Sequence, residues 1–298
     1  MKRLLLVLSA SMLLLCVACK PKTIADIPSQ YVTLEDGAKV HYKVCGSGGI
    51  TLLFVHGFGC DVNVWEKQYE AFRHDTIRMV FVDLPGYGQS DKPETAYTLD
   101  YFADAVKAVI DQLQLRRVVL VGHSLGTPVC RQVVFKYPEV SAALCDIDGV
   151  YCFYTDDADS ANYRHQINDF VEMFHGESYK QNIIDFVSTL SGPFTPEWVT
   201  TYALSTMPRT EENVAYSTMS NLVNKDYWTG EKINIPTLIL CTRNSGLDAD
   251  NKHKMDELYN DATYVELANT GHFIMMEDAG IFNNLLERSY EKWKVTEL

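Results

Sequence analysis

The stretch VVLVGHSLGTPVCRQVV, residues 118–134, joins a short run of aliphatic residues to a segment with helical spacing. The run Val118–Val121 is continuously apolar, as expected for a strand that is buried on both faces of a parallel sheet. In the following Gly122-His123-Ser124-Leu125-Gly126, glycines on both sides of the serine permit close backbone contacts. The stretch therefore predicts a sharp strand-to-helix turn that exposes the Ser124 hydroxyl.

Similar apolar runs recur along the chain and alternate with helical patterns. The other expected strands are Lys39–Val44, Thr51–Val55, Met79–Val82, Ala143–Ile147, Thr237–Cys241 and Tyr264–Leu267. The segment Thr98–Leu115 carries apolar residues at helical spacing, and Thr98 is placed to cap its first turn. This alternation predicts a doubly wound α/β sheet, whose site lies at the carboxyl ends of the strands.

Between residues 149 and 230 the strand pattern lapses and helical spacing takes over, as at Ile167, Phe170, Val171 and Phe174. We interpret this segment as a helical cap. Most of its aromatic and methionine side chains are expected to form the core of the cap. The others are expected to line an apolar substrate pocket.

Gly271-His272-Phe273 follows the last predicted strand, Tyr264–Leu267. His272 is therefore expected at the same edge of the sheet as Ser124, where a histidine can take the proton from a serine hydroxyl. His123 lies inside the turn itself, and we expect its side chain to point away from the site. The other histidines lack a comparable context.

A second glycine-containing loop, His56-Gly57-Phe58-Gly59, follows the predicted strand Thr51–Val55. Negative charge that develops on a substrate oxygen needs fixed N–H donors, commonly one from the residue after the serine and one from such a loop. We expect the backbone amides of Phe58 and Leu125 to supply them. His56 is expected to orient its loop.

Together these pieces resemble the α/β-hydrolase fold family, in its cap-bearing esterase and carbon-carbon hydrolase branch. The matching segments are His56–Gly59, Trp65, Asp83–Ser90, Gly122–Gly126, Pro236–Leu238, Gly271–Phe273 and Glu277. The resemblance implies a doubly wound, mostly parallel eight-stranded sheet formed by residues 31–148 and 231–298. Residues 149–230 would then be inserted as the helical cap.

The acidic partner of the histidine departs from the family's pattern. The family usually places a carboxylate where this chain reads Thr242-Arg243-Asn244-Ser245. Asp248 and Asp250 come a few residues later, whereas Asp148 follows the preceding strand of the sheet. We predict Asp148 as the acid, with Asp248 or Asp250, or no acid at all, as the alternatives. Asp146 is expected to be buried in the sheet.

A serine nucleophile disfavours the family's epoxide-opening and dehalogenating reactions, because these need a carboxylate nucleophile. We expect hydrolysis of the carboxylic ester of an apolar small molecule, through an acyl-enzyme on Ser124 with His272 as base. A carbon-carbon bond hydrolase and a non-catalytic ligand-binding protein are the alternatives. No metal or organic cofactor is expected, because the chemistry needs none and no cluster has metal-ligand spacing.

The first residues are expected to be an export signal. Two basic residues precede the apolar run Leu4–Val17, which is shorter than the roughly 20 residues that span a bilayer. Because the following residues resemble a bacterial lipobox, residues 1–18 are predicted as a lipoprotein signal peptide, Cys19 as the lipidated residue and residues 19–30 as a polar tether. This predicts an anchor in the membrane of a bacterial cell envelope; a simple cleaved signal or an uncleaved anchor is the alternative.

The net charge of −13 argues against a face that binds polyanions, because phosphate contacts need clustered lysine and arginine. We therefore expect no nucleic-acid partner. Cysteine spacing indicates no particular pairing, although Cys45, Cys60 and Cys152 fall in predicted loops and an exported protein can form disulfides.

Overall fold

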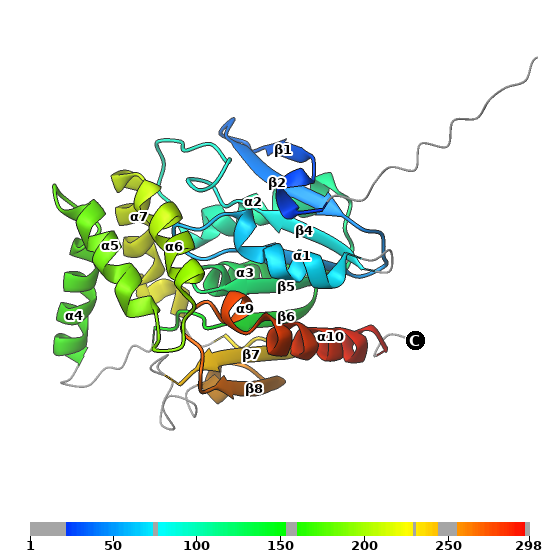
Figure 1. Ribbon diagram of the computed structural model, residues 1–298. Helices are drawn as coiled ribbons and strands as arrows, with labels where there is room; N and C mark the ends of the chain where they lie inside the picture. Colours follow the sequence, from blue (N-terminus) through cyan, green and yellow to red (C-terminus); the bar gives the residue numbers. More distant parts are fainter. Residues whose placement is uncertain (1–21, 74–76, 153–159, 229–230, 244–254, 296–298) are drawn as a thin grey trace, which may run out of the picture.

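The computed structural model describes residues 22–73, 77–152, 160–228, 231–243 and 255–295. Its strands form one sheet in the order β1-β2-β4-β3-β5-β6-β7-β8 (Figure 1). The strands are β1 (Ser29–Thr33), β2 (Lys39–Cys45), β3 (Thr51–Val55), β4 (Arg78–Val82), β5 (Val118–His123), β6 (Ser141–Ile147), β7 (Thr237–Thr242) and β8 (Ala262–Leu267). β2 pairs antiparallel with β1 and β4, and every other pairing is parallel. The expected eight-stranded, mostly parallel sheet is thus confirmed.

Helices cover both faces of the sheet (Figure 1). The helices outside the cap are η1 (Ile24–Asp26), η2 (Val62–Trp65), α1 (Glu66–Phe72), α2 (Leu99–Gln112), α3 (Gly126–Lys136), η3 (Pro138–Val140), α9 (Ile274–Glu277) and α10 (Ala279–Val295). α2 and α3 lie on one face, and α1 and α10 lie on the other. Because both faces are covered, every residue of β3 and of β5 is buried, which explains the apolar runs Leu52–Val55 and Val118–Val121.

The prediction that Thr98 is the N-cap residue of the helix after β4, α2, is confirmed. The Thr98 side chain accepts a hydrogen bond from the backbone N–H of Tyr101 at 3.0 Å, which satisfies one of the free donors at the start of α2. The helix ends at Gln112, before the expected end at Leu115. The reason is local, since Gln114 adopts a left-handed backbone conformation with φ of 53° that a helix cannot contain.

The polar tether predicted for residues 19–30 is wrong over its second half. Ile24 in η1 and Ile27 are fully buried, and the Ile24 N–H donates to Glu66 Oε2 at 2.9 Å. β1 then begins at Ser29 as an edge strand that is half exposed, so its sequence lacks the apolar run by which the other strands were recognised. Residues 1–21, including Cys19, lie outside the described residues.

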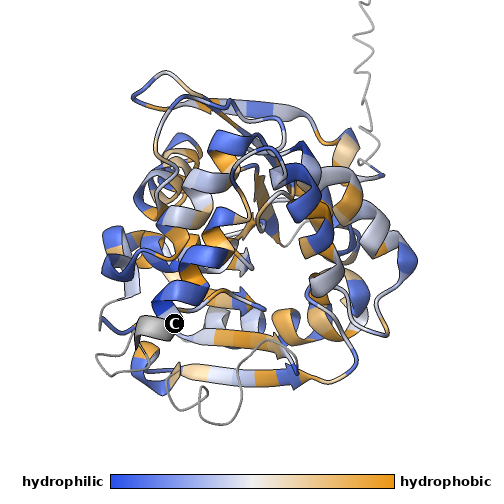
Figure 2. Ribbon diagram, turned by 90° about the vertical axis from the view of Figure 1, so that its left-hand side faces the viewer, coloured by the Kyte–Doolittle hydropathy of each residue, from blue (hydrophilic) through white to orange (hydrophobic). Residues whose placement is uncertain are grey.

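The helices between β6 and β7 gather at the carboxyl ends of the parallel strands (Figure 1). They are α4 (Ser160–Glu172), α5 (Tyr179–Leu190), α6 (Glu197–Thr206), η4 (Met207–Arg209), α7 (Glu212–Leu222) and η5 (Lys225–Trp228). Figure 2 looks onto this cap and shows hydrophilic and hydrophobic segments alternating along its helices. Such alternation is typical of helices with one face packed inward.

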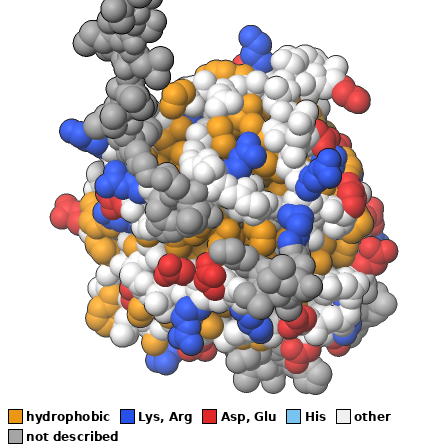
Figure 3. Space-filling view, turned by 90° about the vertical axis from the view of Figure 1, so that its right-hand side faces the viewer, with side chains coloured by type: hydrophobic (Ala, Val, Ile, Leu, Met, Phe, Trp, Pro, Cys, Tyr) orange, Lys and Arg blue, Asp and Glu red, His pale blue; other side chains and the backbone are white. Residues whose placement is uncertain are grey.

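The face turned away from the cap carries acidic and basic side chains with apolar ones between them, where described residues show (Figure 3). No helix in the described part of the chain has both the length and the apolar character required to cross a membrane. None of the cysteines in the predicted loops, Cys45, Cys60 and Cys152, is joined in a disulfide. Burial raises the pKa of the Cys45 thiol to about 11, which keeps it protonated at neutral pH.

Candidate active site

Ser124 lies at a tight turn between β5 and α3, as the sequence predicted. Its φ of 53° is in the left-handed region, which costs energy for a residue with a Cβ. A Cβ on Gly122 would lie 2.5 Å from the Gly126 carbonyl oxygen, and a Cβ on Gly126 would lie 2.2 Å from the Val55 carbonyl oxygen. Only glycine fits at these two positions: Gly122 allows the turn to close on itself, and Gly126 allows it to pack against β3.

Asp148 and His272 form a hydrogen-bonded pair, although they are far apart in the sequence. Asp148 Oδ2 lies 2.7 Å from His272 Nδ1. Because an ionised carboxylate only accepts hydrogen bonds, this contact places the proton on Nδ1 and leaves the Nε2 lone pair of His272 available. The exposed fraction is 6% for the Asp148 side chain and 15% for His272, so solvent competes little for the bond.

The end of β7 supports Asp148 directly. The Thr242 N–H donates to Asp148 Oδ1 at 2.9 Å, and the Asp148 N–H donates to the Leu240 carbonyl at 2.7 Å. The strand after which the family usually places its acid therefore supplies a backbone donor to Asp148, which follows the neighbouring strand. The alternatives Asp248 and Asp250 lie outside the described residues.

A backbone hydrogen bond places Ser124 next to the Asp148–His272 pair. The Ser124 N–H donates to the Ile147 carbonyl at 3.0 Å, one residue before Asp148. The ring of His123, the residue before the serine, lies 4.7 Å from the ring of His272, measured between centroids. The structure thus brings Ser124, His272 and Asp148 together at the adjacent carboxyl ends of β5 and β6.

The loop predicted to supply the second oxyanion donor packs against the turn. A Cβ on Gly57 would lie 2.9 Å from Ser124 Cβ, so the backbone just before Phe58 is in contact with the serine. His56 holds this loop from within, because its Nδ1 contacts the Gly57 carbonyl at 2.8 Å and its Nε2 accepts the Leu84 N–H at 3.1 Å. The ring of Phe58 packs against Phe174 of the cap at 5.3 Å between centroids.

His123 was expected to point away from the site, and that expectation is wrong. Its Nε2 donates to the His272 carbonyl oxygen at 3.0 Å, and its side chain is buried. Burial, reinforced by the neighbouring His272, lowers the pKa of His123 well below its ordinary value. His123 is therefore a neutral donor that fixes the backbone of His272. No signal in the sequence distinguishes this role, because the contact joins residues 149 positions apart.

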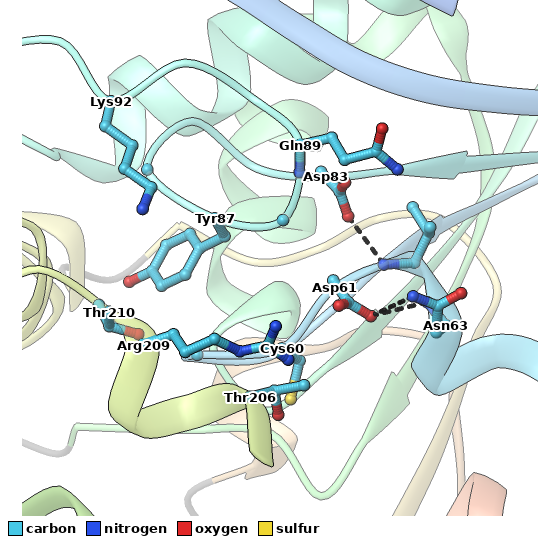
Figure 4. Close-up of a pocket in the computed structure, with 14 residues that line it drawn as sticks. Cys60, Asp61, Asn63, Asp83, Tyr87, Gln89, Lys92, Thr206, Arg209 and Thr210 are labelled. Carbon is cyan, nitrogen blue, oxygen red and sulfur yellow. Dashed lines mark hydrogen bonds between the residues drawn. The ribbon is translucent and has the colours of Figure 1, made fainter. Parts of the chain in front are cut away.

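The loop after β4 is organised around a buried carboxylate. Asp83 accepts hydrogen bonds from His41 Nδ1 at 2.7 Å and from the backbone N–H groups of Val62 and Gln89 at 2.8 Å each (Figure 4). A Cβ on Gly88 would lie 2.2 Å from the Asp83 carboxylate, which makes glycine necessary there. These contacts fix the loop as a structural element.

A polar pocket of about 230 Å³ separates this loop from η4 of the cap (Figure 4). Lys92, Tyr87 and Gln89 line it from the loop, and Arg209 extends across it from η4 toward Cys60. Neither Ser124 nor the Asp148–His272 pair is among its lining residues. The pocket therefore lies beside the candidate active site and is not part of it.

Asp146, two residues before Asp148, is buried in the sheet as expected. Its Oδ2 accepts hydrogen bonds from the hydroxyls of Tyr259 at 2.5 Å and Tyr151 at 3.2 Å. Desolvation outweighs these bonds and the nearby Arg131, and raises the pKa of Asp146 to about 7. The folded protein therefore binds a proton at Asp146 that the unfolded chain releases near pH 4.

This raised pKa predicts a pH dependence of stability. Between about pH 4 and 7 the folded state holds more protons than the unfolded state, so the free energy of unfolding falls as the pH rises. Relative to Asp146→Asn, which cannot titrate, the wild type should lose about 4 kcal/mol across this window at about 1.4 kcal/mol for each pKa unit. Urea unfolding of both proteins at pH 4 and pH 8 measures the difference. Parallel pH profiles for the two would contradict the prediction.

A serine at a strand-to-helix turn beside an Asp–His pair, on an eight-stranded and mostly parallel sheet, defines the hydrolase class of α/β proteins. A family model described as alpha/beta hydrolase fold matches residues 50–279. The chain belongs to this family.

Individual relatives are similar over different shares of their length. The AB hydrolase superfamily protein YisY of Bacillus subtilis is 26% identical over 86% of this chain and 97% of its own length. A 2-hydroxy-6-oxononadienedioate/2-hydroxy-6-oxononatrienedioate hydrolase of Paraburkholderia phymatum is 36% identical over 37% of this chain. The chain spans only 41% of that relative, and 40% and 28% of two other curated relatives that it matches.

Solved structures show the same fold. An esterase from Exiguobacterium antarcticum superposes with a TM-score of 0.77 over 89% of this chain and all of the esterase, at 20% sequence identity. At 20% identity this similarity shows a shared fold and does not show a shared reaction, which depends on the residues at the site.

Proposed function

We propose that this protein hydrolyses a carboxylic ester or a related acyl bond, with Ser124 as nucleophile, His272 as general base and Asp148 as the acid that orients the base. The observation that carries the proposal is the 2.7 Å contact between Asp148 Oδ2 and His272 Nδ1 beside a serine with a strained backbone. A histidine with a purely structural role does not need a carboxylate on Nδ1 beside a strained serine. A nucleophilic serine needs a histidine to take its proton and a carboxylate to orient that histidine.

In the proposed reaction, Ser124 Oγ attacks the acyl carbon while its proton passes to His272 Nε2. Asp148 stabilises the imidazolium, and the N–H groups of Phe58 and Leu125 stabilise the negative oxygen. His272 then protonates the departing alcohol, which leaves an acyl group on Ser124. Water attacks this ester with His272 again as base, and the carboxylic acid is released with the serine restored.

The nucleophile narrows the substrate class. Epoxide opening and dehalogenation in this family proceed through an ester of an aspartate, and the turn of this chain carries Ser124 instead. Cleavage of a carbon-carbon bond is the second candidate, as expected from the branch of the family that the sequence resembles. The Paraburkholderia relative that is 36% identical over 118 residues is named a 2-hydroxy-6-oxononadienedioate/2-hydroxy-6-oxononatrienedioate hydrolase. The apolar rings at the cap face of the site, Phe58 and Phe174, favour an apolar acyl or aryl group.

The proposal is tested with purified protein, a series of p-nitrophenyl esters, a vinylogous diketone and a fluorophosphonate. Ester hydrolysis with an initial burst of p-nitrophenol, together with labelling by the fluorophosphonate, is the expected result, because the acyl-enzyme forms in a separate first step. Turnover of the diketone alone would favour the carbon-carbon hydrolase. Folded protein that neither labels nor turns over any substrate would favour a ligand-binding protein.

We also propose that the protein is exported and anchored in the envelope by a lipid on Cys19. The support lies in the sequence, where the apolar run Leu4–Val17 ends at a lipobox-like Cys16-Val17-Ala18-Cys19. Metabolic labelling with a radioactive fatty acid should mark the wild-type protein and not Cys19→Ala. Equal labelling of both, or of neither, would contradict the anchor.

A further inference from the structure

The loop that carries the candidate base is held by hydrogen bonds on each of its residues. The N–H groups of Gly271 and Phe273 donate to the two carboxylate oxygens of Glu277, at 2.7 and 3.1 Å. The His272 carbonyl accepts from His123 at 3.0 Å. Glu277 and His123 belong to the hydrolase core, so most of this support is independent of the cap.

The His272 N–H, in contrast, is bonded to the cap. It donates to the carbonyl oxygen of Leu190, the last residue of α5, at 3.0 Å. This carbonyl is at the end of a helix and has no intrahelical N–H to accept from. The His272 N–H and the Leu190 carbonyl at the end of α5 therefore satisfy each other's hydrogen-bonding requirement.

A second bond runs from the cap to the same loop through Thr195. Its hydroxyl donates to Glu277 Oε2 at 2.8 Å and accepts the Gly192 N–H at 2.8 Å. Glu277 Oε2 is also the oxygen that accepts the Gly271 N–H. Thr195 thus acts on the base loop through Glu277 and uses its hydroxyl both as donor and as acceptor.

The two loops also fit closely in shape. A Cβ on Gly271 would lie 2.5 Å from Thr195 Oγ1 and 2.8 Å from the Gly192 nitrogen. Conversely, a Cβ on Gly192 would lie only 3.5 Å from the Gly271 Cα. The cap segment Leu190–Thr195 and the base loop are therefore closely packed, with the Thr195 hydroxyl and the backbone of Gly192 against Gly271.

We propose that the cap segment Leu190–Thr195 positions the base, and that Thr195 is a positioning residue for His272. This inference rests on the proposed function of Ser124 and His272. The cap is then a part of the catalytic machinery as well as a cover, because displacing it breaks the bond to the His272 N–H. A base that shifts by a fraction of an ångström loses its alignment with both the serine and Asp148, which lowers kcat more than it changes substrate binding.

The test compares Thr195→Val with Thr195→Ser in the purified protein. Valine keeps the shape of threonine and removes the hydroxyl, so kcat should fall roughly ten- to a hundredfold while KM changes little. Serine retains the hydroxyl and should restore most of the activity. Thr189→Val is the matched control, because Thr189 is an exposed cap threonine whose hydroxyl bonds only to the Phe186 carbonyl among the described residues. Its kinetics should match the wild type.

A second measurement does not depend on turnover. The proton between His272 and Asp148 should give a downfield ¹H NMR resonance, identified by its disappearance in Asp148→Asn. Thr195→Val should shift or broaden this resonance, and Thr195→Ser and Thr189→Val should leave it in place. An unchanged resonance together with unchanged kcat in Thr195→Val would overturn the positioning role. A wild type that shows the resonance and its response to Thr195→Val, but hydrolyses nothing, would overturn only the proposed function.

Discussion

Ser124→Ala should abolish ester hydrolysis, with kcat lower by about 10⁴-fold or more, and should prevent labelling by a fluorophosphonate. The substitution removes the oxygen that forms the acyl-enzyme and leaves the base and the oxyanion donors in place. Alanine also keeps the same backbone strain at φ of 53°, so the turn itself is not relieved. Steady-state kinetics with p-nitrophenyl esters and gel detection of the label measure both effects.

Ser141→Ala is the matched control for the nucleophile. Ser141 is a buried serine at the amino end of β6, and its hydroxyl has no hydrogen-bond partner among the described residues. Its kinetics and labelling should equal those of the wild type. Labelling of Ser124→Ala at the wild-type rate would show that another residue is the nucleophile.

Asp148→Asn should lower kcat by about 10³- to 10⁴-fold with the fold intact. The Thr242 N–H requires the asparagine oxygen to occupy the position of Oδ1, so the amide nitrogen turns toward His272 Nδ1. His272 then has to accept at Nδ1 and carry its proton on Nε2, where it can no longer take the serine's proton. Asparagine tolerates the positive φ of 42° at this position better than most residues, so little stability should be lost.

Asp248→Asn and Asp250→Asn carry the same change of charge and serve as the controls for Asp148→Asn. Both should retain kcat within about threefold of the wild type, because Asp148 already bonds to the base. Circular dichroism and thermal unfolding should show that all three variants are folded. If Asp248→Asn or Asp250→Asn lost activity while Asp148→Asn kept it, the acid would come from the segment after β7.

The strands were predictable because their signal is local. Seven of the eight were recognised from their apolar residues, and in β3, β4, β5, β6 and β7 nearly every residue is buried because helices cover both faces of the sheet there. β1 was missed because Ser29–Thr33, an edge strand with no buried residue, has only two apolar residues, Tyr31 and Val32. The burial of Ile24 and Ile27 was missed with it, because two isoleucines in a polar segment become core only when β2 and α1 lie beside them.

The sequence by itself determined the sheet, the serine turn and the histidine after the last strand, because each follows from residues that are adjacent in the chain. It left the acid open, because Asp148 and Asp248 each come after a predicted strand and the sequence does not give the distance of either residue to His272. Tertiary structure pairs Asp148 with His272: the parallel pairing of β6 with β7 places the Thr242 N–H on one carboxylate oxygen of Asp148 and leaves the other facing His272. It also gave His123 and Thr195 their roles, since their contacts with the base loop join segments that meet only when the sheet and cap assemble.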